Sequence, residues 1–187
     1  MKKRIMALML AAMMVFSLTA CGSSKLSAAV RDAEAGSGVV YLDDAAVALV
    51  GSLADVGMSE AEIARAAELR AMAVEAFDLV NAYRAVYGLP ALVWDDQLEA
   101  CAMVRATEIA TTFSHTRPNG SDWWTVNSDL MWGENLAKGY KDATKLVTGW
   151  MNSPTHAANI LDAEYVTCSI AVYEVGGKLY FAQEFGY

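Results

Sequence analysis

The C-terminal segment "YVTCSIAVYEVGGKLYFAQEF" constrains the fold of this chain more than any other stretch. Two runs rich in β-branched and aromatic residues flank Gly176-Gly177, and such a pair of glycines suits the tight turn of a β-hairpin. The residues before this segment show mainly helical patterns. Helices followed by an antiparallel hairpin predict an α+β fold, in which the helices pack on the sheet.

The first strong helical pattern opens at the motif "SEAE", where Ser59 and Glu62 have the spacing of a capping box. This helix is expected to stop at Gly88, just before Pro90. Its apolar residues recur with the three-and-four spacing of a buried face. The pattern therefore predicts a long helix with one side against the core.

Three further helices are predicted before the hairpin. Asp95 is the expected N-cap of "DQLEACAMVRATEIATTF", whose apolar stripe is interrupted by Arg105. "GENLAKGY" is expected to form a turn that leads into another short element, and "ATKLVTGWMN" is predicted to be a helix. The next helix begins in "SPTHAANIL", with Ser153 as N-cap and Pro154 first, where its missing N–H costs nothing.

The N-terminus has the features of an export signal. Residues 1–20 combine three basic residues with an apolar run too short to span a bilayer comfortably. The following "LTAC" resembles the lipobox of bacterial lipoproteins, in which Cys21 becomes the lipid-modified first residue. Residues 21–42 are small and polar and are interpreted as a flexible tether. Residues 43–71 are expected to form a helical N-terminal extension.

The charge balance excludes two classes of partner. The formal net charge is −8, and removal of residues 1–20 would bring it to about −11, because only basic residues leave. Nucleic-acid binding needs clustered Lys and Arg, so we expect no nucleic-acid partner. The same acidity argues against electrostatic binding of a basic patch to anionic lipid. Attachment to the membrane is therefore expected through acyl chains on Cys21.

Two cysteines remain in the mature chain, and both lie in apolar surroundings. Cys101 falls in a predicted helix and Cys168 in a predicted strand. An exported protein works where disulfides persist, so this pair is compatible with one bridge. Two separate buried thiols are the alternative, and the sequence does not decide between them.

The chain has two histidines, and each lies in a polar segment that could carry chemistry. His115 is in the loop "FSHTRPNGSDWW", and His156 is in the first turn of a predicted helix. There the positive end of the helix dipole keeps the imidazole neutral, as a metal ligand or a general base requires. Glu134 of "GEN" could complete a metal site or orient an imidazole. The alternative for His156 is that it only helps to satisfy free N–H groups.

Four tryptophans crowd around the same segments. Trp123, Trp124, Trp132 and Trp150 are interpreted as core and groove wall, because tryptophan is usually largely buried. A platform for stacking sugars is the alternative.

Five motifs occur together in a fixed order and resemble a known family. They are "LVNAYRAVYGLPALVWDDQLEACAMVRATEI", "FSHTRPNG", "WGENLA", "WMNSPTHAANIL" and "VTCSIAVYEVGGKLYFAQEFG". In this order they resemble the bacterial branch of the CAP superfamily of cysteine-rich secretory, antigen 5 and pathogenesis-related proteins, also called the SCP domain. The resemblance covers residues 72–187 and implies a three-layer α-β-α sandwich with a central cleft.

The resemblance also implies a site within that cleft. Family members place two histidines and two acidic residues there, and some bind a divalent cation such as zinc. His115, Glu134 and His156 match three of these positions. The fourth, acidic in the family, falls on Ser153, and Glu184 of the last strand is a further candidate neighbour. This departure leaves a His-Glu-His set, and three ligands with an open position would still suit zinc.

Three functions are compatible with the resemblance, because the family has no single agreed activity. The first is a lipid-anchored extracellular binding module that takes a lipid, peptide or envelope ligand near His115, Glu134 and His156. The second is a metal-assisted hydrolase of the cell envelope, in which a bound water attacks a carbonyl group. The third is a structural envelope protein whose cleft has no ligand.

Overall fold

The computed structural model describes residues 57–187. The export signal of residues 1–20, the lipidation at Cys21, the tether of residues 21–42 and the helical pattern of residues 43–56 all lie outside the described residues. They therefore stay predictions. None of the described helices is both long and apolar enough to cross a membrane.

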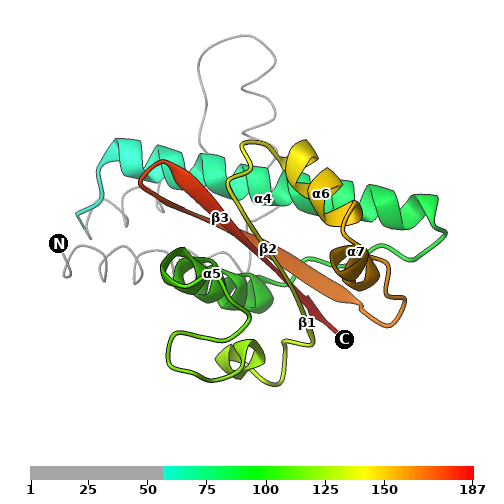
Figure 1. Ribbon diagram of the computed structural model, residues 1–187. Helices are drawn as coiled ribbons and strands as arrows, with labels where there is room; N and C mark the ends of the chain where they lie inside the picture. The colour runs from blue at the N-terminus through cyan, green and yellow to red at the C-terminus, as the bar shows by residue number, and fades with distance from the viewer. Residues whose placement is uncertain (1–56) are drawn as a thin grey trace, which may run out of the picture. The chain divides into compact units, whose positions relative to one another are not determined.

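The chain divides into two compact units, Met1–Glu68 and Leu69–Tyr187. The long helix α4 crosses the boundary between them, and every contact discussed below from Leu69 onward lies within the second unit. In chain order the described elements are α4 (Glu60–Val86), α5 (Asp96–Thr111), the 3₁₀ helix η1 (Trp123–Val126), β1 (Gly133–Lys138), α6 (Ala143–Met151), α7 (Pro154–Ile160), β2 (Thr167–Val175) and β3 (Lys178–Gly186) (Figure 1).

The helices begin where the capping signals predict. At the start of α4, the backbone N–H of Ser59 donates to Oε2 of Glu62 at 2.8 Å, and the N–H of Glu62 donates to Oγ of Ser59 at 3.3 Å. Asp95 caps α5 by accepting from the N–H of Leu98 at 2.7 Å. Ser153 is the N-cap residue of α7, but its side chain makes no capping hydrogen bond.

The sheet has three antiparallel strands in the order β1-β3-β2. The predicted hairpin of β2 and β3 is confirmed, and Gly176 and Gly177 both have positive φ, at 60° and 74°. The expectation of a turn at "GENLAKGY" was wrong, because Gly133–Lys138 forms the edge strand β1. Its partner β3 lies about 50 residues along the chain, so no local pattern could indicate the pairing.

Helices cover both faces of the sheet, as Figure 1 shows. On one face, Ala102, Ala106 and Ile109 of α5 pack against Leu136, Ala171 and Ala182 of the strands. On the other face, α4, α6 and α7 surround a larger core that includes Trp150, Ile170 and Phe181. The predicted α+β fold, a three-layer α-β-α sandwich with a C-terminal hairpin, is therefore confirmed.

The possible disulfide between Cys101 and Cys168 is not formed, because both residues are buried free thiols. Cys101 of α5 packs with Leu98 and Met131. Cys168 of β2 points to the opposite face of the sheet, where its Sγ accepts a weak hydrogen bond from Nε2 of Gln183 at 3.4 Å. The sheet therefore separates the two sulfur atoms.

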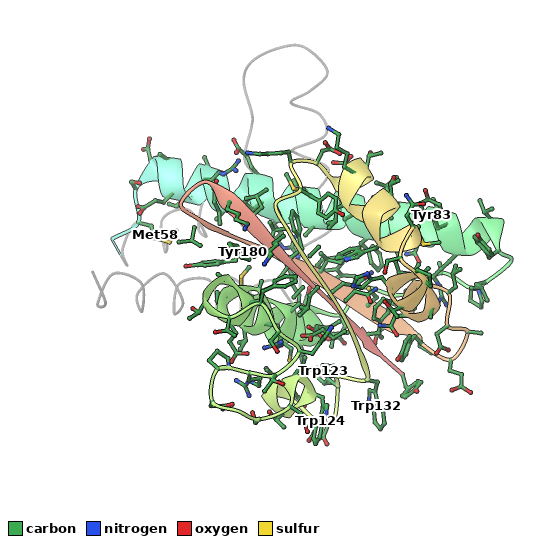
Figure 2. All side chains as sticks on the ribbon, viewed as in Figure 1. Met58, Tyr83, Trp123, Trp124, Trp132 and Tyr180 are labelled. Carbon is green, nitrogen blue, oxygen red and sulfur yellow. The ribbon has the colours of Figure 1, made fainter. Side chains whose placement is uncertain are left out.

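The tryptophans do not all belong to the core. Trp150 is buried, whereas Trp124 and Trp132 are 41% and 52% exposed. Figure 2 shows Trp123, Trp124 and Trp132 around η1 and the start of β1. Trp124 and Trp132 are therefore not core residues, and their place in a groove wall stays a prediction.

Candidate functional site

The loop histidine and the strand carboxylate meet in the second unit. His115 lies between α5 and η1 with its side chain 59% exposed, whereas the side chain of Glu134 on β1 is only 1% exposed. The distance from Nδ1 of His115 to Oε1 of Glu134 is 2.7 Å. A carboxylate acceptor at this distance places a proton on Nδ1. In a neutral ring, Nε2 is then left with a free lone pair.

Arg105 of α5 holds Glu134 from the protein interior. Its Nε donates to Oε2 of Glu134 at 2.6 Å, and its Nη2 donates to Oε1 at 3.3 Å. The same guanidinium donates to Oε2 of Glu108 and to the backbone carbonyl of Ser114, the residue before His115. Burial lowers the pKa of Arg105, but its hydrogen bonds to Glu134 and Glu108 outweigh this and raise it. One buried cation thus anchors both the carboxylate and the histidine loop.

Arg117, two residues after His115 in the same loop, also binds Glu108. Its Nη2 donates to Oε1 of Glu108 at 2.7 Å, and its Nη1 donates to Oγ1 of Thr125 at 3.3 Å. The chain of contacts therefore runs from Arg117 through Glu108 and Arg105 to Glu134. Its two arginines balance its two carboxylates, which keeps this largely buried network near neutral.

The second histidine lies at the start of α7. His156 is half-buried, and its Nδ1 is buried without a hydrogen-bond partner among the described residues. Burial lowers the pKa of His156, and the positive charge of a protonated His115 lowers it further. Glu134 contacts the ring of His115, and the next residue of β1, Asn135, contacts the backbone carbonyl of His156, so β1 connects the two histidine segments.

Amide side chains hold α7 against β1. Nδ2 of Asn135 donates to the backbone carbonyl of His156 at 3.1 Å and to Oε1 of Gln183 at 3.0 Å. Nδ2 of Asn159 donates to the carbonyl of Glu134 at 3.2 Å and to Oδ1 of Asn135 at 2.9 Å. The strand that carries Glu134 therefore also sets the position of His156.

The two remaining candidates have different environments. Ser153 precedes α7, and its Oγ lies 3.3 Å from Oγ1 of Thr155. Glu184 lies directly opposite Glu134 in the pairing of β1 with β3 and is fully buried. Burial raises the pKa of Glu184 well above the usual range, and the negative charge of Glu134 raises it further. Neither oxygen of Glu184 accepts a hydrogen bond from residues 57–187.

A zinc site with three protein ligands does not fit these side chains as they stand. Among the described residues, no group of three or more His, Cys, Asp or Glu side chains is placed to hold a metal ion. Both oxygens of Glu134 are already engaged, by Arg105 and His115. Glu134 therefore has the position of a carboxylate that orients a histidine, and the two imidazoles are the nitrogen donors that remain.

The role of Arg105 was not predicted from the sequence, although the sequence contained a signal for it. The residue interrupted an otherwise apolar helix stripe, and a charge at a core-facing position needs a charged or hydrogen-bonding partner. That partner is Glu134, which lies 29 residues away. Asn135 and Asn159 gave no such signal, because isolated asparagines are common on helix and loop surfaces.

Comparison with known proteins identifies the family. The model of the cysteine-rich secretory protein family, CAP, matches residues 77–185. This chain belongs to the CAP family. The match covers His115, Glu134 and His156 as well as the whole sheet.

Bacterial relatives support this assignment to the CAP family. The protein YkwD of Bacillus subtilis is 32% identical over 106 residues, which are 53% of this chain and 41% of YkwD. The membrane protein YlbC of the same organism is 27% identical over 118 residues, which are 58% of this chain and 32% of YlbC. The CAP protein described here thus spans less than half of the length of these relatives.

Solved structures also resemble the CAP domain of this chain. An extracellular SCP-domain protein from Bacillus anthracis is 25% identical with a TM-score of 0.59, covering 70% of this chain and 44% of that chain. An outer surface protein of Borrelia burgdorferi is 20% identical with a TM-score of 0.51, covering 59% of this chain and 87% of that chain. The second likeness shows a shared fold.

Proposed function

We propose that this CAP protein is an exported binding module whose ligand contacts the imidazoles of His115 and His156. The observation that carries the proposal is the hydrogen bond between Nδ1 of His115 and Glu134. It leaves Nε2 of an exposed ring available to a ligand. The second ring, His156, has a lowered pKa and an unpartnered Nδ1. In this proposal Glu134 orients the first ring instead of contacting the ligand.

The chemistry of two neutral imidazoles favours a divalent cation of the borderline class, such as Zn²⁺. A cation on two protein ligands keeps positions open for donor atoms from a lipid, a peptide or another envelope molecule. The carboxylate behind His115 increases the basicity of that ring, as carboxylates do behind histidine ligands in metal sites. The expected cation is therefore one part of the binding surface for a larger ligand.

Export and anchoring are part of the same proposal. They are supported by the signal of residues 1–20 and by the lipobox-like sequence that ends at Cys21. The protein from Bacillus anthracis is likewise extracellular, and the one from Borrelia burgdorferi is a surface protein. We expect the wild type to fractionate with bacterial membranes. A Cys21→Ala variant should lose this association, and equal membrane fractions for both proteins would exclude the anchor.

Zinc binding tests the site directly. Addition of Zn²⁺ is expected to raise the melting temperature, and the double substitution His115→Ala with His156→Ala should abolish that rise. Asp129→Asn is a suitable control, because it removes an exposed carboxylate from the same part of the chain but no imidazole. An unchanged zinc effect in the double variant would exclude these histidines as the binding site.

A second candidate function is hydrolysis of envelope peptide, and the pair of His115 and Glu134 favours it. A histidine oriented by a buried carboxylate has the arrangement of a general base in many hydrolases. Incubation with casein and with purified peptidoglycan, each with and without a chelator, discriminates the two functions. A product that disappears in His115→Ala would establish the hydrolase, and its loss with the chelator would show that the reaction needs a metal. The absence of any such product would leave the binding module.

A further inference from the structure

Glu184 is a buried acid to which no side chain among the described residues donates, and Arg105, the cation that acts on it, is bound to Glu134. In the register of the sheet it lies opposite Glu134 on one side and opposite Ser169 on the other. Side chains directly opposite each other in antiparallel strands are close neighbours on the same face, and like charges there destabilise the sheet. Two ionised carboxylates in this row would therefore repel each other without access to water.

The neighbouring groups cannot compensate a second negative charge. The hydroxyl group of Ser169 donates to the backbone carbonyl of Asp95 at 2.6 Å, so its hydrogen is not available to Glu184. Arg105 donates to Glu134, Glu108 and the carbonyl of Ser114. As a result neither oxygen of Glu184 has a donor in the described part of the chain, although the side chain is fully buried.

The charge of the network reinforces this conclusion. Arg105 and Arg117 carry two positive charges, and Glu108 and Glu134 carry two negative charges. A third carboxylate at Glu184 would leave one uncompensated charge in the protein interior, which is costly. A protonated Glu184 leaves the network balanced.

We propose that Glu184 is a positioning residue, a neutral carboxylic acid that donates its O–H to Glu134 at neutral pH. Glu134 then accepts hydrogen bonds from three directions, namely from Arg105, His115 and Glu184. The position of Glu134 determines where the ring of His115 points, so Glu184 acts on the site through Glu134. The hydrogen bond from Glu184 to Glu134 does not depend on the proposed function. Its importance for ligand binding does, because it assumes that His115 contacts the ligand.

The protonation pattern agrees with the environment of the pair. Burial is the main cause that raises the pKa of Glu184, followed by the negative charge of Glu134. Arg105 opposes this shift but is already bound to Glu134. The two facing carboxyl groups therefore hold one proton and one negative charge between them.

Infrared spectroscopy tests the proton without any ligand. The full chain at neutral pH should show the C=O stretching band of a protonated carboxyl group, and the band should be absent in Glu184→Gln. Glu99→Gln is the matched control, because Glu99 is also buried but accepts two hydrogen bonds from Arg70. The band should persist in this control. A wild-type protein without the band, or a band that survives in Glu184→Gln, would overturn the proposal.

A second measurement tests the positioning role. Glutamine keeps a neutral donor at position 184. Leucine is of similar size but apolar, so it removes the donor. The proton on Nδ1 of His115, followed by ¹⁵N NMR, should exchange slowly in the wild type and in Glu184→Gln but faster in Glu184→Leu. Equal exchange in all three proteins would refute positioning. Both measurements are made without ligand, so a failure of the proposed binding function would leave their outcome unchanged.

Discussion

Arg105 of α5 and Glu134 of β1 form an ion pair in the protein interior, with 2.6 Å between Nε and Oε2. The side chains of both residues are at most 1% exposed. The pair joins the helix layer to the edge strand, and Glu134 extends the connection to His115 at 2.7 Å. The same contact therefore contributes to stability and to the geometry of the candidate site.

Removal of the arginine should be strongly destabilising. Arg105→Leu leaves Glu134 and Glu108 without their shared donor, and loss of one partner of a buried pair costs about 3–5 kcal/mol. Urea unfolding measures this change in the free energy of unfolding. Lys145→Gln is the control, because its pair with Asp142 is exposed and should contribute little to stability. Equal losses in both variants would contradict a special role for Arg105.

The protonation of His156 should make stability depend on pH. Its pKa is lowered in the folded state, so the unfolded chain binds the proton more readily. The stabilising contribution is complete above the unfolded pKa of about 6.5 and is lost as the pH falls from there toward the folded pKa. In His156→Gln this part of the pH dependence should disappear from unfolding curves recorded between about pH 7.5 and 5.

The proximity of the two rings can be checked in the same range. His115→Gln removes the positive charge that helps to lower the pKa of His156, so that pKa should rise in the variant. NMR titration of the His156 ring protons measures it. Asn119→Gln, a substitution in the same loop that changes no charge, should leave the pKa in place. Identical titrations of His156 in the wild type and His115→Gln would mean that the rings are not neighbours.

Asn135 should be essential for the attachment of α7. Its amide joins the carbonyl of His156, Gln183 and Asn159 in one buried group. Asn135→Ala leaves these partners unsatisfied, at a cost of about 1–3 kcal/mol. Hydrogen exchange in α7 should accelerate in this variant. Exchange as slow as in the wild type would show that packing alone holds the helix.

The two cysteines should be inert in the folded protein. Burial is the main cause that raises the thiol pKa to about 11 at Cys101 and to about 12 at Cys168. Thiols react as thiolates, so native protein near neutral pH should resist alkylation. Peptide mass spectrometry should find label on Cys101 and Cys168 only after denaturation. An unlabelled pair in denatured, unreduced protein would instead demonstrate a disulfide.

The elements that formed as predicted are those whose signals are local. Ser59 with Glu62, and Asp95 with Leu98, satisfy helix N-termini over three residues, and Gly176-Gly177 closes the hairpin over two. Such patterns depend on neighbours in the chain, so they can be recognised before the fold is known. The motif order that resembled the CAP family added the three-layer arrangement.

β1 escaped prediction because its partner strand is distant in the chain. "GENLAKGY" is short and contains two glycines and an asparagine, so its local pattern resembles a turn. Pairing of Leu136 with Ala182 makes it a strand.

The sequence also could not decide whether the two cysteines form a disulfide. Whether they can bond depends on which side of the sheet each sulfur occupies, and that follows from the register of β2 and the packing of α5.

The sequence by itself determined the helix starts, the hairpin, the α+β class and the motifs that nominate His115, Glu134 and His156. Only the tertiary structure decided that Glu134 binds Arg105 and that Glu184 faces Glu134 from the next strand. The reason is physical. Caps and turns are satisfied by residues close in the chain, whereas the partner of a buried charge is chosen by strand register and helix packing across the whole domain.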